Sequence, residues 1–202
     1  MPLQFEQRLK RGLADYQPEI FSLDRPQAAV LVPLILLPEP LVLLTVRAAH
    51  LNSHPGEVSF PGGMVEAIDR SLTDTALRET FEEIGFEPAR FEVMGPLSTT
   101  LSKNGVLVHP IVGLAQSAEG GLASPDEIAE IFTVPWSFFA TQAPEMETMD
   151  RHGIEFHIPH FHYQGKHIWG LTAMILLELI NLLEGTAWPI PDFASATRPG
   201  AG

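Results

Sequence analysis

Apolar positions mark out the regular elements at the start of this chain. Their spacing predicts an amphipathic helix over residues 3–15, with an apolar side made of Leu3, Phe5, Leu9 and Leu13. Two runs rich in Val, Ile and Leu follow, at 28–37 and 41–46, with Pro-Glu-Pro between them. This pattern predicts paired strands around a turn. Because both runs are continuously apolar, we expect strands that are covered on both faces.

The rest of the chain mixes further strands and helices. Strands are expected over 91–97, 106–114 and 154–163, the last from its alternating apolar residues. Residues 126–139 indicate a short acidic helix or turn that leads into an apolar segment. The mostly apolar stretch 168–184, ended by Gly185, predicts a buried helix. We therefore expect one α/β (α+β) domain.

A long loop runs into a well-marked helix in the middle of the chain. Residues 51–71 are dense in Gly, Pro, Ser and Asn, and a loop of this length in a compact domain is usually functional or disordered. The helix predicted over 73–84 has a start that Thr73 or Asp74 can cap, and Gly85 suits the left-handed residue after its end. The marked helix favours a functional loop.

The amino-acid composition argues against several classes of protein for this chain. The chain has 202 residues, 45% of them hydrophobic and 18% charged, so disorder is not its main state. Its formal charge of −13 argues against a nucleic-acid partner, and the absence of cysteine excludes disulfides and thiolate zinc sites. The start of the chain has no signal-peptide pattern, and the longest apolar run is about half a membrane span. We expect a cytoplasmic protein without a membrane partner.

The predicted helix at 73–84 carries the most informative chemistry. At about 100° per residue, Glu79, Glu82 and Glu83 share one arc of its surface. Carboxylates on a rigid element, without His or Cys among them, suit a hard ion such as Mg²⁺ or Mn²⁺. The face between about 100° and 200° should meet the core, and it carries Leu77, Thr80, Phe81 and Ile84.

A glycine-rich approach precedes this acidic face. Phe-Pro-Gly-Gly at 60–63 permits close backbone contact with a ligand, and exposed amide groups there can hold phosphate oxygens. An anion-binding loop beside a divalent cation is what diphosphate chemistry requires. Arg47 and Lys103, scarce bases near expected strand ends or loops, are the best candidates for contacts with substrate phosphates.

These residues resemble the Nudix hydrolase box, Gly-x5-Glu-x7-Arg-Glu-U-x-Glu-Glu-x-Gly-U, where U is bulky and apolar. Gly63 is followed by five residues, Asp69, eight residues and then Arg78 to Phe86. Asp69 stands in place of Glu, one extra residue precedes Arg78, and Thr80 fills an apolar position. The Arg-Glu-x-x-Glu-Glu core is intact.

A second resemblance narrows the family. Residues 43–63 are similar to the segment before the box in the coenzyme A diphosphatase branch, although Asn52 replaces its second Arg. The resemblance implies a Nudix fold, a mixed sheet sandwiched between helices. It also implies metal-dependent hydrolysis of coenzyme A or its thioesters to 3′,5′-ADP and 4′-phosphopantetheine.

The resemblance assigns roles to several of these residues. Glu79, Glu82 and Glu83 would hold Mg²⁺ or Mn²⁺, with Glu82 as a third ligand or as the base. Glu82, Glu83 and Arg78 would serve catalysis, with Arg78 orienting a carboxylate. Substrate contacts would come from Arg47, Gly62, Gly63 and Lys103. The Nudix domain would span 25–187, between a helical extension (1–24) and a flexible tail (188–202), and a homodimer stays open.

Several alternatives remain beside this reading. Asn52 keeps open another substrate, such as ADP-ribose, and a non-catalytic Nudix-type binding module is the third hypothesis. Glu66, Glu127 and Glu130 are further carboxylates near the site, of which Glu66 is favoured. His157, His160 and His162 give weak support for zinc, and a place for His162 or His167 in the lining of the substrate pocket is a better-supported alternative than a zinc site. The aromatic cluster of Trp136, Phe138 and Phe139 suits core packing better than adenine stacking.

Overall fold

The computed structural model describes residues 2–21, 23–151 and 154–191. The chain begins with helix α1 (Pro2–Asp15), which buries Phe5 and Leu9 as the apolar spacing predicts. Strands β1 (Gln27–Ile35) and β2 (Leu41–Arg47) pair antiparallel around the Pro-Glu-Pro turn, which confirms the predicted pair. Most of their residues are buried, because both faces of these strands are covered.

The central sheet has the order β3-β2-β1-β7-β5, with β4 on β1, β6 on β7 and β8 on β2. Its other strands are β3 (Val58–Ser59), β4 (Gly62–Met64), β5 (Glu92–Pro96), β6 (Thr100–Leu101), β7 (Leu107–Ala115) and β8 (Ile128–Pro135). Strands β1 and β7 run parallel over nine residue pairs, whereas the other pairings are antiparallel. The sheet is therefore mixed, as expected.

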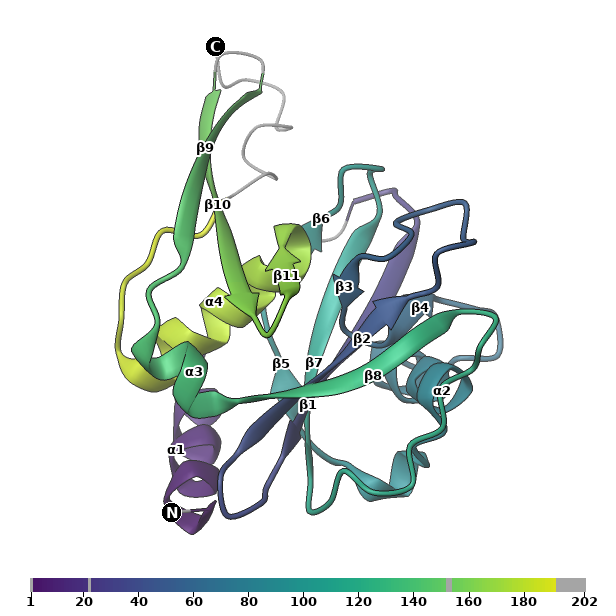
Figure 1. Ribbon diagram of the computed structural model, residues 1–202. Coiled ribbons are helices and arrows are strands. Elements are labelled where there is room, and N and C mark those ends of the chain that lie inside the picture. Colours follow the sequence, from purple (N-terminus) through teal and green to yellow (C-terminus); the bar gives the residue numbers. More distant parts are fainter. Residues whose placement is uncertain (1, 22, 152–153, 192–202) are drawn as a thin grey trace.

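Helices cover both faces of this sheet (Figure 1). Alternate residues of β1 point to opposite sides, so Val32 and Leu34 join a core with α1 and α4 (Gly170–Glu184). Leu31 and Ile35 join a second core beneath α2 (Leu72–Ile84). The acidic helix α2 thus lies on one face of the sheet, while α1 and α4 share the other.

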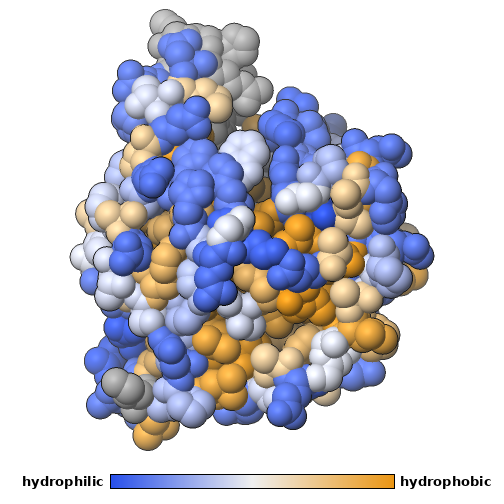
Figure 2. All heavy atoms as spheres, viewed as in Figure 1, coloured by the Kyte–Doolittle hydropathy of each residue, from blue (hydrophilic) through white to orange (hydrophobic). Residues whose placement is uncertain are grey.

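A smaller sheet follows the central one. Strands β9 (Glu145–Arg151), β10 (Ile154–Tyr163) and β11 (Lys166–Trp169) pair antiparallel, and β10 matches the predicted strand at 154–163. The pair β9–β10 projects from the molecule in Figure 1. Figure 2 shows mainly hydrophilic residues on this projection, whereas hydrophobic ones gather on the face that β8 crosses.

The helix alternative for residues 126–139 is wrong. A turn at 125–127 leads into β8, and helix α3 (Trp136–Thr141) begins only after it. Pairing with β2 explains the difference, since β8 fills that sheet edge over seven residue pairs. The loop 51–71 likewise contains the short strands β3 and β4, and the short 3-10 helix η1 (Pro88–Arg90) follows α2.

Helix α2 differs from its prediction at its start and in its buried face. Ser71, rather than Thr73 or Asp74, caps the helix, because its Oγ accepts the amide hydrogen of Asp74 at 3.1 Å. Gly85 ends the helix in a left-handed conformation, as predicted. Phe81 is 44% exposed instead of buried, whereas Glu83 is 2% exposed. The buried face therefore lies nearer the glutamates than the apolar pattern indicates.

No helix among residues 2–21, 23–151 and 154–191 has the length and apolarity needed to span a bilayer. The predicted flexible tail at 188–202 falls mostly outside these residues, since 192–202 are not described.

Candidate active site

Two glycines of β4 bring the sheet into close contact with α2. The Gly62 amide donates a hydrogen bond to Glu83 Oε2 at 3.1 Å. At Gly63, an added Cβ would lie 2.4 Å from the carboxyl carbon of Glu79. Both carboxylates therefore lie close to glycine backbone, and a side chain at Gly63 would displace Glu79, whereas one at Gly62 would meet the backbone of β1. The predicted phosphate contact of the two glycines stays a prediction, and the Gly62 amide already has Glu83 as its acceptor.

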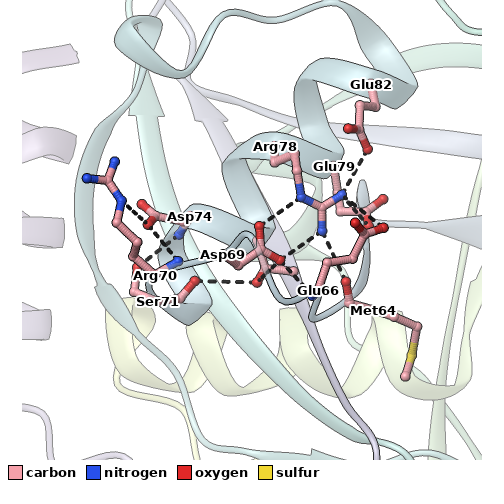
Figure 3. A network of polar contacts seen from close by, with 10 residues as sticks. Met64, Glu66, Asp69, Arg70, Ser71, Asp74, Arg78, Glu79 and Glu82 are labelled. Atoms are coloured by element: carbon pink, nitrogen blue, oxygen red, sulfur yellow. Dashed lines mark hydrogen bonds and ion pairs between the residues drawn. The ribbon is translucent and has the colours of Figure 1, made fainter.

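Arg78 lies at the centre of a polar network (Figure 3). Its Nε and Nη2 donate to the two carboxylate oxygens of Asp69 at 2.8 and 2.9 Å. Its Nη1 donates to Glu79 and to Glu82, both at 2.9 Å, and its Nη2 also donates to the Met64 carbonyl at 3.1 Å. These five bonds match the five N–H donors of a guanidinium. Arg78 therefore contacts two of the predicted metal ligands and is more than an i,i+4 partner of Glu82.

Asp69 is the second anchor of this network. Its carboxylate is 3% exposed and also accepts hydrogen bonds from Thr75 Oγ1 and the Glu66 amide, both at 2.9 Å. The Arg78 hydrogen bonds, with the Glu66 amide next, hold the pKa of Asp69 well below its usual range. The position where the box has Glu thus carries a carboxylate that is stabilised in its charged form and holds the guanidinium in place.

Glu83 is the buried carboxylate of the site. Desolvation raises its pKa to about 7, although the Gly62 amide and the Arg47 charge oppose this effect. Arg47 Nη1 lies 3.8 Å from Glu83 Oε1, which is an ion pair without a hydrogen bond. The Arg47 Nε is buried and bonds to no described residue. Arg47 reaches this place because it ends β2, at an irregularity in its pairing with β8.

Glu79 is partly desolvated as well. Burial raises its pKa, and the Arg78 hydrogen bond only partly opposes this. Glu79 and Glu83 lie on one rigid helix, and their neighbours only partly balance their negative charge. Their oxygens are the donors that a hard divalent cation prefers. Among the described residues, no three carboxylate or imidazole groups already lie together in an arrangement that holds an ion. The donor chemistry of Glu79 and Glu83 thus fits a hard divalent metal.

Other predicted residues are less closely placed. Lys103 is exposed in the turn between β6 and β7, and no hydrogen bond or ion pair joins it to the rest of the described chain. Glu66 Oε1 lies 4.0 Å from Arg78 Nη1, and the Glu66 side chain is largely exposed. Glu130 forms an ion pair with Lys166 instead of facing the box. The assigned roles of these residues remain predictions.

The histidines considered for zinc lie on β10, whereas the aromatic cluster lies on α3 in the core shared with α1 and α4. His160 Nδ1 and His167 Nε2 are 2.8 Å apart, and His162 stacks on His167 across β10 and β11. Within the described residues these histidines form no group of three or more that could hold a metal ion. Trp136 and Phe139 are buried against neighbouring rings, as core packing requires.

Sequence reasoning missed Thr75 and the Met64 carbonyl as parts of the network. In the sequence, the only signal for Thr75 is its place one turn before Glu79 on the same helix face. Its position next to Asp69 is seen only in the structure. A cavity of about 410 Å³ lies elsewhere, between the segment after α1, residues 98–101 and α4. Its lining includes Tyr16, Ser98 and Glu178 but no box residue, so we do not place the chemistry there.

The chain is similar to several known proteins. The profile of the NUDIX domain family matches residues 25–152. A Photorhabdus laumondii protein called an uncharacterized Nudix hydrolase NudL is 40% identical over 168 residues, which are 83% of this chain and 90% of that protein. A Yersinia enterocolitica protein of the same name is 38% identical over 81% of this chain and 84% of its own length. Among solved structures, a C. elegans Ap4A hydrolase is 19% identical with a TM-score of 0.47, over 55% of this chain and 80% of that one.

Proposed function

Because the chain belongs to the Nudix hydrolases, we propose that it is a Mg²⁺- or Mn²⁺-dependent diphosphatase for coenzyme A or its thioesters. Hydrolysis of a nucleoside diphosphate derivative is the general activity of this family. One observation carries the narrower substrate. The segment that resembles the coenzyme A branch, residues 43–63, supplies Arg47, Gly62 and Gly63, which all contact or approach the box glutamates.

Different residues of the site would bind the metal, accept the proton of the attacking water and hold the other side chains in place. Glu79 and Glu83 would hold the metal, with Glu82 as a third ligand or as the base for the attacking water. A bound divalent ion neutralises phosphate charge and lowers the pKa of a coordinated water. Arg78 keeps Glu79 and Glu82 in place through its hydrogen bonds, and Asp69 fixes Arg78. Arg47 supplies positive charge beside Glu83, which would attract a substrate phosphate to this side of the carboxylates.

The reaction adds water across the diphosphate. The water oxygen forms a bond to one phosphorus, the bridging P–O bond breaks, and the base takes the water proton. The products would be 3′,5′-ADP and 4′-phosphopantetheine, or its acyl form. Two other expectations stay predictions, namely that the protein has no nucleic-acid partner and that it is cytoplasmic. Whether it forms a homodimer stays open.

Another nucleoside diphosphate derivative, such as ADP-ribose, is the second candidate. Asn52 favours it, because this exposed residue stands where the coenzyme A branch has a second Arg. A non-catalytic binding module is disfavoured by the retained glutamates and by the relatives named as hydrolases.

Side-by-side kinetics test the substrate. We would measure kcat/KM for coenzyme A, acetyl-coenzyme A, ADP-ribose and a dinucleotide, each with Mg²⁺ and with Mn²⁺, and identify the products by mass spectrometry. We expect the highest kcat/KM for a coenzyme A compound and release of 3′,5′-ADP. A clear preference for ADP-ribose would replace the proposal by the second candidate.

A further inference from the structure

The cavity of about 410 Å³ beside α4 has no part in the proposed diphosphatase reaction. Its volume lies within the range of pockets that take small molecules, roughly 300–1,000 Å³. Apolar side chains form part of its wall, among them Phe21, Met174 and Ile175. The polar groups beside them decide which class of molecule could bind there.

A chain of hydrogen bonds fixes Glu178 in the wall of this cavity. Its Oε1 accepts the Tyr16 hydroxyl and the Ser98 amide, the latter at 2.7 Å. Burial and the Glu178 hydrogen bond raise the pKa of Tyr16, so its phenol stays protonated and is the donor. The Ser98 hydroxyl, 2.9 Å from Tyr16 Oη, then donates to Tyr16 and accepts the Glu19 amide hydrogen at 3.1 Å. Two donors thus occupy both lone pairs of Glu178 Oε1.

The other carboxylate oxygen of Glu178 is free to meet a ligand. Glu178 Oε2 bonds to no described residue and is not fully buried. Among the described residues that line the cavity, Glu19 and Glu178 are the charged ones, and neither forms an ion pair within the described chain. A carboxylate in a partly apolar cavity without a basic neighbour favours the entry of positive charge.

The segment that carries Ser98 is held in place from two directions. The Thr99 amide donates to the Glu19 carbonyl at 2.8 Å, and Thr99 Oγ1 lies 3.1 Å from Nδ1 of the buried His109. Strand β6, which follows directly, pairs with β7. These bonds are made within the chain itself, so the wall is preformed, and a preformed wall lowers the cost of binding a ligand.

We propose that this cavity is a second binding site, which takes a small organic cation. An ammonium group would donate to Glu178 Oε2, with the Glu19 carboxylate adding negative charge. The apolar part of the ligand would lie against Phe21, Met174 and Ile175. The same two carboxylates repel phosphates, so the site suits a different molecule from the substrate of the box. The inference therefore stands apart from the proposed function.

Three probes with the same aromatic ring and different head groups test the charge preference. Phenethylamine, phenethyl alcohol and phenylpropionate are titrated into the full chain, and binding is followed by amide NMR shifts. We expect phenethylamine to bind about tenfold or more tightly than the alcohol, as a charge-assisted hydrogen bond provides. Phenylpropionate should not bind. The largest shifts should fall on Ser98, Thr99 and Met174.

Three variants locate the site and isolate the charge. Glu178→Gln keeps an oxygen for Tyr16 and Ser98 but loses the charge, so it should weaken phenethylamine about tenfold and leave the alcohol nearly unchanged. Glu119→Gln removes an exposed carboxylate outside the lining and should bind both probes like wild type. Ile190→Trp fills the cavity without touching the hydrogen-bond chain, so it should weaken both probes. Thermal unfolding checks that each variant is folded.

Several results would overturn this inference. One is equal affinity of the amine and the alcohol for wild type, which would make the cavity merely apolar. Another is an amine that shifts only Glu79, Glu82 and Glu83, since it would then bind the acidic helix instead. Unchanged amine binding in Ile190→Trp, or no binding of phenethylamine to wild type, would also exclude the cavity as the site. None of these results bears on diphosphatase activity.

Discussion

Arg78 and Asp69 meet through two hydrogen bonds of 2.8 and 2.9 Å, each between a different nitrogen and a different oxygen. The box expects a glutamate at this position and one residue fewer before the arginine. This chain has both a shorter acidic side chain, Asp69, and one extra residue before Arg78. The two residues nevertheless form a two-point contact. This contact positions the arginine that holds Glu79 and Glu82.

Asp69→Asn should lower kcat and leave KM nearly unchanged. Asparagine removes the charge and one acceptor, so Arg78 and its bound carboxylates lose their fixed orientation. We expect a reduction of about 10- to 100-fold, as for other groups that orient metal ligands. Steady-state kinetics measure this effect, and Asp69→Glu should retain more activity than Asp69→Asn because it keeps the charge. Equal activity of Asp69→Asn and wild type would show that the contact is dispensable.

Gly63→Ala should abolish activity with little loss of stability. The added Cβ meets the end of the Glu79 side chain at 2.4 Å, which can move away and thereby leave the site. Gly62→Ala should instead destabilise the fold by roughly 2 kcal/mol or more, because its Cβ meets the Ala29 carbonyl at 2.4 Å. Gly95→Ala is the matched control, since Gly95 has a similar φ of 145° and open space around it. Thermal unfolding and kinetics of the three variants separate the effects.

Stability without metal should fall as pH rises from about 5 to 8. The pKa of Glu83 in the folded state, about 7, lies above its unfolded value, so the folded state binds more protons between these pH values. The expected loss is on the order of 3 kcal/mol for a fully buried group. Denaturant unfolding in EDTA at several pH values measures it. Glu83→Gln should flatten this dependence, and an unchanged slope in that variant would assign the titration to another group.

Arg47→Gln should raise KM for the diphosphate substrate about tenfold or more, because it removes the positive charge beside Glu83. The comparison variant is Lys103→Gln, which tests the other base predicted to contact substrate. Because Lys103 lies in an exposed turn, we expect its effect to be smaller and to vanish at high salt. A larger effect of Lys103→Gln than of Arg47→Gln would reverse our assignment of the phosphate contact.

Glu79→Gln and Glu83→Gln should each lower kcat by several orders of magnitude while the fold is kept. Both substitutions remove a proposed metal ligand and preserve the shape of the side chain. Glu87→Gln, an exposed residue just after α2, is the control for general loss of charge. Circular dichroism checks folding, and near-normal kcat in either ligand variant would count against the site.

The sequence predicts much of the fold from apolar pattern alone. The β1–β2 pair, β10 and the end of α2 at Gly85 agree with prediction. Short strands such as β3 and β4 are missed because two or three residues carry no periodic signal. The helix alternative for 126–139 fails because the residues before β8 are acidic and the strand character of β8 depends on pairing with β2.

The site, like the fold, is only partly predictable from the sequence. Spacing places the three glutamates on one arc of α2, but hydropathy cannot show that Glu83 is buried while Phe81 is exposed. That burial depends on contact with Gly62, a residue 21 positions away. The double contact of Arg78 with Asp69 likewise follows from the path of the loop, which no local pattern fixes.

The covering of the central sheet by α1 and α4 has a consequence for truncation. The family profile ends at residue 152, yet Leu176, Leu179 and Leu183 of α4 pack into the same core as Leu34 and Leu114. A fragment cut to 25–152 would expose that apolar face to water and aggregate. Because α1 and α4 supply part of this core, we expect the shortest fragment that folds stably to include both helices.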